Sequence, residues 1–174
     1  AQLIWLNFKK HKLAFVSLIV LVVIYVVTIF ANFFAPYDPL NYEAQRKFQP
    51  PQRPRFISTE GFHLRPFVYG FNVTRNPETL GLEFDIDTSE RYPIYLFVKG
   101  DSYDFLGIFE GNVHFFGTRE GHIYLLGGDS LGRDVLSRIL YGGRISTSIG
   151  FIGVIISLTL GLTIGGIAGL VGGW

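Results

Sequence analysis

The side chains that could do chemistry are few in this sequence, and their spacing does not form a familiar site. His63, His114 and His122 do not make the H-x-x-x-H pair that places two metal ligands on one helix face. A metal site built from them would need convergence in the folded chain. The sequence contains no cysteine, so thiolate metal sites and disulfides are excluded. We therefore expect no metal and no cofactor.

Nucleotide-binding and nucleophile motifs are also missing from the sequence. No G-x-x-x-x-G-K-[ST] loop is present to hold ATP phosphates, and no G-x-S-x-G turn presents a serine. Asp85/Asp87 and Asp101/Asp104 could be paired carboxylates, but turn chemistry explains such short polar clusters better. The net charge of +1 gives no case for nucleic-acid binding. The sequence predicts a protein that is not itself an enzyme.

The elements that dominate the chain are apolar. Hydrophobic residues make up 48% and charged residues 17%, against roughly 25% charged in soluble domains. Residues 13–35 are almost entirely apolar, and at about 1.5 Å per residue they reach roughly 34 Å, enough to span a bilayer core. A signal peptide would have a shorter apolar region and a small-residue cleavage site, unlike Phe33-Phe34-Ala35-Pro36. We predict a transmembrane helix, with the basic segment 1–12 in the cytoplasm.

A second apolar run covers residues 145–171 and contains no charged residue. Its glycine content would make a poor helix in water, but in lipid the backbone must satisfy its own hydrogen bonds, so a second transmembrane helix is expected. Four glycines at four-residue spacing form a stripe: Gly161, Gly165, Gly169 and Gly173. Such a stripe lets another helix approach closely, although glycine is also simply common in membrane helices. Either way, this helix requires partner helices.

Residues 36–127, between the two runs, have a different character. Residues 36–54 are rich in proline and read as an extended connector. Short aromatic and β-branched runs then alternate with turn residues, which indicates strands. The candidate strands are 67–73, 92–98, 122–126 and, more weakly, 80–87. The expected fold class is a membrane α-helical protein with a mostly β extracytoplasmic insertion, whose role is either a spacer or the docking of a binding protein.

Residues 128–144 read as an amphipathic helix at the membrane interface. Its expected features are an N-cap at Asp129 or Ser130, an apolar row of Leu131, Val135 and Ile139, and an ion pair between Asp134 and Arg138. Gly142-Gly143 is expected to end this helix before the second membrane run begins. The alternative is that the charges are only a solvated face.

A family resemblance is carried by two motifs. The run LGRDVLSR-x-x-YGGRIS, followed by a glycine-rich helix ending in GGW, resembles permease subunits of dipeptide/oligopeptide/nickel-type ABC importers. The run FKKHKLAFVSLIVLVVIYVVTIFANFFAPYDP resembles the first helix of the second, C-type permease of those systems. The resemblance covers about residues 3–40 and 127–174. The motif residues are Leu131, Gly132, Arg133, Asp134, Arg138, Tyr141 and Arg144.

The resemblance implies a six-helix, multi-pass permease of a bacterial-type inner membrane. Its partners would be a second permease subunit, two cytoplasmic ATPase subunits and an extracytoplasmic substrate-binding protein. The substrate would be a peptide or similar small solute. The chain starts at Ala1 and stops at Trp174 directly after an apolar run, so we expect an N-terminal fragment with two of the six helices and without the ATPase-coupling loop.

A membrane-anchored extracytoplasmic sensor or protein-interaction module is the alternative function. The polypeptide beyond Trp174 would separate the two: four more helices favour the transporter, and a soluble signalling domain favours the sensor. Three arginines of the motif lie on the side predicted to be external, against the positive-inside tendency, but the first helix usually dominates orientation.

Overall fold

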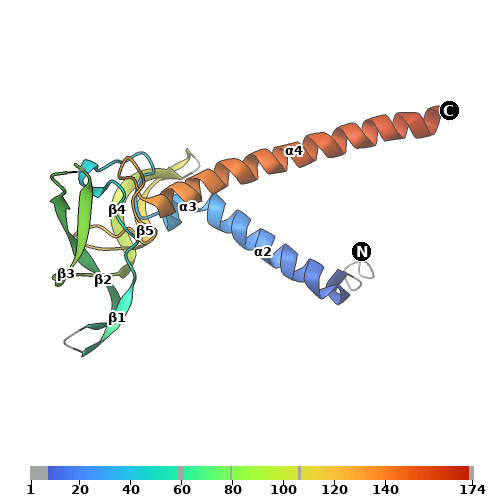
Figure 1. Cartoon of the computed structure of the whole chain (residues 1–174). Coiled ribbons are helices and arrows are strands. Elements are labelled where there is room, and N and C mark those ends of the chain that lie inside the picture. The colour runs from blue at the N-terminus through green and yellow to red at the C-terminus, as the bar shows by residue number, and fades with distance from the viewer. Residues whose placement is uncertain (1–7, 59–60, 79, 106, 173–174) are drawn as a thin grey trace.

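Two long helices leave one side of a β-rich head and diverge from each other (Figure 1). The computed structural model describes residues 8–58, 61–78, 80–105 and 107–172. The helices are α2 (Lys12–Ile29) and α4 (Val135–Val171), and both are long and apolar enough to cross a membrane. The free ends of the two helices lie on the same side, away from the head.

The first apolar run forms two helices rather than the single helix predicted over residues 13–35. Helix α2 ends at Ile29, Phe30 has φ −91° and ψ 26°, and α3 (Ala31–Phe34) begins directly after it. At this break the carbonyls of Thr28 and Ile29 accept hydrogen bonds from an external donor, the guanidinium of Arg144. Pro36 then prevents further helix.

The second apolar run and the segment before it form one continuous helix, α4 (Val135–Val171). The prediction of an interfacial helix over 128–144, separate from a membrane helix over 145–171, is therefore wrong. Gly142-Gly143 does not interrupt the helix. The second of these glycines lies where α4 meets α2: a Cβ there would be 2.9 Å from Cγ2 of Thr28. The glycine allows close helix approach and does not act as a breaker.

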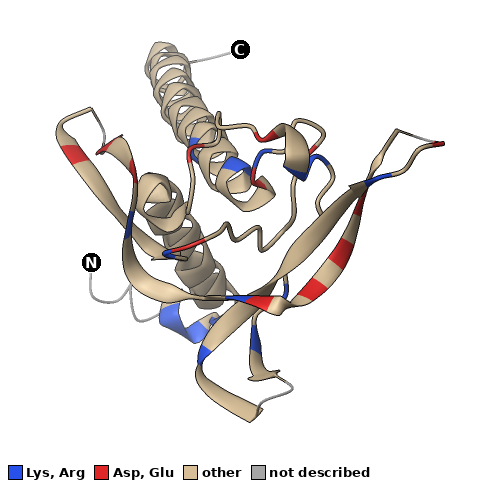
Figure 2. Cartoon of the chain, turned by 90° about the vertical axis from the view of Figure 1, so that its left-hand side faces the viewer, with Lys and Arg blue, Asp and Glu red and all other residues tan. Residues whose placement is uncertain are grey.

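The head consists of two antiparallel sheets, which confirms a β-rich insertion. One sheet has the order β1-β2-β3, and the other pairs β4 with β5. The strands are β1 (Arg55–Ser58), β2 (Gly61–Arg75), β3 (Leu82–Pro93), β4 (Tyr95–Phe105) and β5 (Phe109–Gly117), and a 3-10 turn η1 (Ala44–Arg46) lies in the connector. The strand predicted over 92–98 crosses from β3 into β4, with the break at Ile94. Figure 2 shows acidic residues gathered along the β2–β3 hairpin.

The strand predicted over residues 122–126 is not formed. Ile123 and Tyr124 are buried at 0% and 3% exposure in an irregular segment. Their backbone groups bond elsewhere: Ile123 N donates to Tyr37 Oη (2.8 Å), and Tyr124 N donates to Gln52 Oε1 (2.6 Å). Side chains of the connector thus satisfy the buried backbone, so no neighbouring strand is required.

Candidate functional site

Residues 127–134, called the glycine loop here, pack tightly beneath the connector. Phe48 N donates to the carbonyl of Asp129 (3.0 Å), and Gly128 N donates to the carbonyl of Gln49 (2.9 Å). Gly132 has φ +77°, and a Cβ added there would overlap the carbonyl oxygen of Glu43 and lie 2.8 Å from its carbonyl carbon. Only glycine combines this left-handed conformation with such a close approach of two backbones.

The carboxylate of Asp129 organises this loop. Its Oδ1 accepts from the backbone N–H groups of Leu131 (2.8 Å) and Arg133 (2.9 Å). Its Oδ2 accepts from Nε of Arg133 (2.9 Å) and from Nη1 of Arg138 (2.5 Å). Burial alone would raise the pKa of Asp129, but the backbone and guanidinium of Arg133 outweigh it and lower the pKa to about 2. Arg138 therefore pairs with Asp129, and the ion pair predicted with Asp134 is not formed.

Asp134 is the N-cap of α4, a role that was predicted for Asp129 or Ser130. Its Oδ2 accepts from the backbone N–H of Ser137 (2.8 Å) and from the Ser137 hydroxyl (2.7 Å). Asp134 is 1% exposed, and its Oδ1 has no hydrogen-bond partner among the described residues. Burial raises the pKa of Asp134 despite the hydrogen bonds from Ser137.

Thr28, Gly143, Arg144 and Thr147, called the helix junction here, join the two long helices. Arg144 donates from Nε to the carbonyl of Thr28 (3.0 Å) and from Nη2 to that of Ile29 (2.7 Å). A cation here neutralises the negative end of α2 and occupies carbonyls that a helix end leaves without partners. The hydroxyls of Thr28 and Thr147 lie 3.3 Å apart.

The remaining motif residues divide between the loop, the junction and the free part of α4. Leu131 lies outside any helix and is 47% exposed. Tyr141 is partly buried, with the guanidinium of Arg144 5.5 Å from its ring centroid. The glycine stripe has no described atom within 4 Å of an added Cβ at Gly161, Gly165 or Gly169. Gly173 lies outside the described residues.

The three histidines predicted as poor metal ligands lie in separate places with separate partners. His63 Nε2 is 2.7 Å from Ser58 Oγ, but Arg91 Nη1 lies 3.4 Å from the same nitrogen and competes for its lone pair. His114 Nε2 lies 3.0 Å from the carbonyl of Asp101. Across the described part of the chain, no group of three or more His, Asp or Glu side chains is placed to hold a metal ion.

A polar cavity of about 220 Å³ between the connector and the β1–β3 sheet was not predicted. Arg46 pairs with Glu43, lies 3.2 Å from His122 Nδ1, and donates to Gln49 Oε1 (3.1 Å). Burial and the nearby Arg46 lower the pKa of His122. A signal was present in the sequence: the polar residues 43, 46, 49 and 52 recur every third position, the period that places residues on one face of a polyproline II or 3-10 segment.

The arrangement as a whole positions two helices. Its buried charges and polar groups form hydrogen bonds that hold the connector, the glycine loop and the two helix ends together. Asp129, Asp134 and Arg144 each bond to backbone groups of this site.

Comparison with known proteins finds similarity for the first 51 residues. Residues 1–51 match the N-terminal TM domain of oligopeptide transport permease C. A dipeptide transport system permease protein of Haemophilus influenzae is 56% identical over 50 residues, which cover 29% of this chain and 17% of that protein. An oligopeptide transport system permease protein of the same organism is 48% identical over 56 residues, 32% of this chain and 18% of that protein. A nickel transport system permease protein of Escherichia coli is 50% identical over 48 residues, which cover 28% of this chain and 17% of that protein. No solved structure matches the chain.

Proposed function

We propose that this chain is an N-terminal region of a C-type permease of the peptide and nickel importer family, and that it forms part of the translocation pathway of an ATP-driven importer for peptides or similar small solutes. The observation that carries the proposal is the match over residues 1–51, which contains the whole of α2. The matched part covers only 17% of the first relative's length, so the complete pathway would need further helices and a partner permease. Two cytoplasmic ATPases and an extracytoplasmic binding protein would complete the importer.

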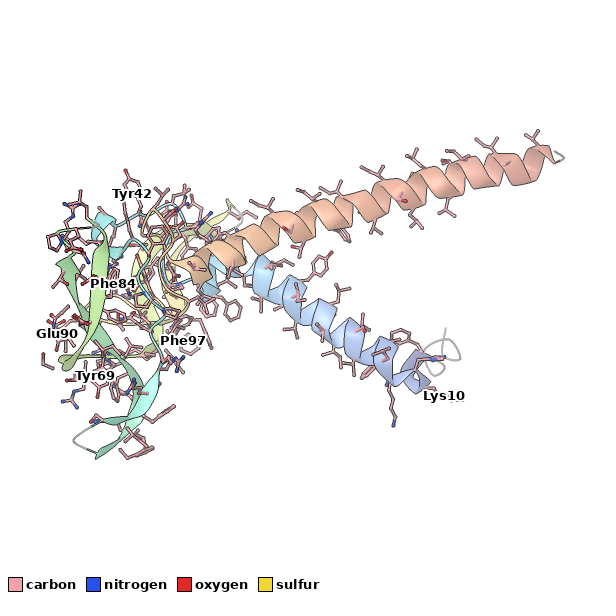
Figure 3. The ribbon with its side chains drawn as sticks, in the orientation of Figure 1. Lys10, Tyr42, Tyr69, Phe84, Glu90 and Phe97 are labelled. Atoms are coloured by element: carbon pink, nitrogen blue, oxygen red, sulfur yellow. The ribbon has the colours of Figure 1, made fainter. Side chains whose placement is uncertain are left out.

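The proposed orientation has the N-terminus in the cytoplasm and the head outside. Lys9, Lys10 and Lys12 lie at the end of α2 far from the head, where Figure 3 labels Lys10. Basic residues favour the cytoplasmic side. Helix α2 has 18 residues and is about 27 Å long at about 1.5 Å per residue, close to the thickness of a bilayer core. Because α4 returns on the same side, its C-terminal end would also be cytoplasmic.

The divergence of the two helices supports a place for partner helices. Beyond the helix junction, α2 and α4 separate (Figure 1). Most of the apolar side chains of α4 are exposed, and no described atom lies within 4 Å of a Cβ added at Gly161, Gly165 or Gly169 of the glycine stripe. In the proposed assembly, other membrane helices would pack against this stripe.

The head is proposed to act first as a spacer that fills the space beside the two helix ends and adds contacts to them. Asn32 Nδ2 in α3 donates to the carbonyl of Asp104 in β4 (3.1 Å), and His114 in β5 bonds to the carbonyl of Ala35. The β4–β5 hairpin thus holds the segment directly after α2.

Uptake by cells that lack their own peptide and nickel importers tests the proposal. The substrates to offer are a dipeptide, an oligopeptide, glutathione and Ni²⁺, because the relatives are named for these solutes. The complete transporter, with its own ATPases and binding protein, should give ATP-dependent uptake of at least one. Gly143→Val should reduce this uptake because the side chain meets Thr28, and Gly142→Val, where no described atom is near, should retain it. Absence of uptake for all four solutes, or equal uptake by the two variants, would contradict the proposal.

Cysteine labelling tests the orientation separately. Leu131 is exposed, so Leu131→Cys should react with a membrane-impermeant maleimide added outside the cell. Lys10→Cys should react only after the membrane is opened. The reverse pattern would place the head in the cytoplasm and reject the orientation.

A further inference from the structure

The tip of the β4–β5 hairpin is apolar, although hairpin tips in water are usually polar. The described residues there include Phe105, Gly107, Ile108 and Phe109. Ile108 is 70% exposed and Phe109 is 67% exposed. A contiguous exposed apolar group of this kind marks a surface that something covers.

The fold places this tip at a defined height along α2. The ring of Phe105 stacks on Phe30 at 5.2 Å between centroids and 25° between planes. Phe30 directly follows α2, whose 18 residues carry the chain about 27 Å from Lys12 at about 1.5 Å per residue. A bilayer core is about 30 Å thick, so Phe30 and the ring stacked on it reach the outer boundary of the hydrocarbon. Figure 1 shows β4 and β5 beside α3, in agreement with this height.

A second group of aromatic rings continues the same surface. Phe33 lies 6.1 Å from Phe97 and 5.8 Å from Phe115, and Phe97 lies 6.0 Å from Phe115, between ring centroids. Phe97 is 64% exposed, on the side of the head that faces α2 (Figure 3). Its φ is +56°, a left-handed conformation that is a true outlier for a bulky residue. Such strain persists where the surrounding structure holds it and is often linked to function.

We infer that this aromatic ledge, defined as Phe30, Phe33, Phe97, Phe105, Ile108 and Phe109, binds the headgroup region of the outer leaflet. Phe and other large apolar side chains anchor peripheral elements at this depth because they insert into the boundary between headgroups and acyl chains and bury their apolar area there. Asp104 and Glu110 are exposed and lie opposite each other in the β4–β5 register, just behind the tip. Their charges hold the tip in the interface, out of the core, and select zwitterionic over anionic headgroups.

The inference deepens the proposed function and rests on its orientation of α2. The ledge gives the head a second attachment to the membrane beside its helices. It restrains the tilt of the head against the membrane surface, in addition to the two helices that join at the helix junction. The β1–β3 sheet, which carries the acidic hairpin, lies on the side of the head away from the helices and stays in the aqueous phase (Figure 1).

A lipid-depth measurement tests the ledge. These 174 residues contain no cysteine, so Ile108→Cys can carry one environment-sensitive NBD label in the complete protein, with any cysteine elsewhere replaced. The protein is reconstituted in phosphatidylcholine bilayers with spin-labelled lipids that quench at a shallow or a deep position. The expected result is blue-shifted emission with loss of fluorescence to the shallow quencher. Phe109→Cys repeats the measurement in case Ile108→Cys does not fold.

Two matched positions make each outcome decisive. Leu64→Cys, 89% exposed on the β1–β2 hairpin, should be unaffected by either quencher. Leu21→Cys, in the middle of α2, should lose fluorescence to the deep quencher. An unquenched tip with a quenched Leu21→Cys overturns the ledge and leaves the proposed orientation intact. A blue-shifted but unquenched tip shows cover by protein and also overturns it. Failure of quenching at both positions overturns the ledge and the membrane placement together.

Discussion

Replacing Gly132 by alanine should destabilise the head and the start of α4 together. Gly132 has φ +77°, and its added Cβ would overlap the carbonyl oxygen of Glu43 and lie 3.3 Å from the carbonyl carbon of Arg46. Both obstacles are backbone atoms of the connector, so no side-chain rotation can relieve the overlap. The glycine loop would have to move away from the connector.

The size of the effect follows from two costs. An alanine in the left-handed region costs about 1–2 kcal/mol relative to glycine, and forcing an added methyl into a packed interface costs about 1–3 kcal/mol. Together they lower the free energy of unfolding by about 2–5 kcal/mol. Gly142→Ala is the matched control, because this helical glycine has no described atom within 4 Å of an added Cβ. It should be stabilising by about 0.5–1 kcal/mol.

Thermal unfolding in detergent, followed by near-ultraviolet circular dichroism of the tyrosines in the head, measures the difference. A change of 1 kcal/mol moves the unfolding midpoint of a domain of roughly 60–100 residues, such as the head, by about 4–8 °C. Gly132→Ala should therefore unfold at least about 8 °C below wild type. If Gly132→Ala and Gly142→Ala unfold at the same temperature, the tight contact between the glycine loop and the connector is refuted.

Three further predictions concern the charged residues of the site. Asp134→Ala should lose about 0.5–2 kcal/mol of stability with the N-cap, whereas Asp134→Asn keeps an accepting oxygen, removes a buried charge and should unfold close to wild type in the same thermal scan. The pKa of Asp129 is lowered to about 2; its carboxylate therefore stabilises the fold above about pH 4, and this contribution is lost as the pH falls towards 2. Asp129→Asn should be less stable than wild type at pH 7 and should show a smaller loss of stability between pH 4 and pH 2. Arg144→Ala removes both hydrogen bonds to the end of α2. A disulfide between Thr28→Cys and Thr147→Cys should therefore form more slowly in the Arg144→Ala background, as measured by gel shift. An unchanged rate would contradict the role of Arg144.

The parts of the fold that the sequence predicted are those with a long, repeated signal. The two apolar runs and the aromatic β-branched segments of the insertion each extend over many residues, and the environment that they prefer is clear from composition alone. Exact element ends were less predictable because they depend on partners distant in sequence. Phe30 interrupts the first run at the point where Arg144, far along the chain, bonds to the carbonyls of α2.

The wrong expectations in the motif share a physical cause. Asp129 and Asp134 both suit an N-cap by residue type, and their roles were decided by tertiary contacts. The carboxylate of Asp129 accepts hydrogen bonds from Arg133 and Arg138, and Asp134 is the residue that caps α4. Gly142-Gly143 has the composition of a helix end, but Gly143 is the contact with Thr28 that lets α2 and α4 meet. Local pattern does not distinguish a glycine that ends a helix from one that admits a neighbouring helix.

The β head is inserted into the connection between α3 and α4, and hydrogen bonds join the two ends of the insertion. Gln52 N donates to the carbonyl of Tyr124 (2.9 Å), and Tyr124 N donates to Gln52 Oε1 (2.6 Å), so the chain leaves and re-enters the head at one place. Below this closure the connector bonds to the glycine loop, the loop leads into Asp134, and Asp134 starts α4. The position of α4 relative to α2 therefore depends on residues 36–52 and 124–144 and on the helix junction. The β4–β5 hairpin adds its contacts to α3 from outside this frame. Because these bonds close the frame without the strands, we expect a change in strand length to leave the relation of the two helices nearly unchanged.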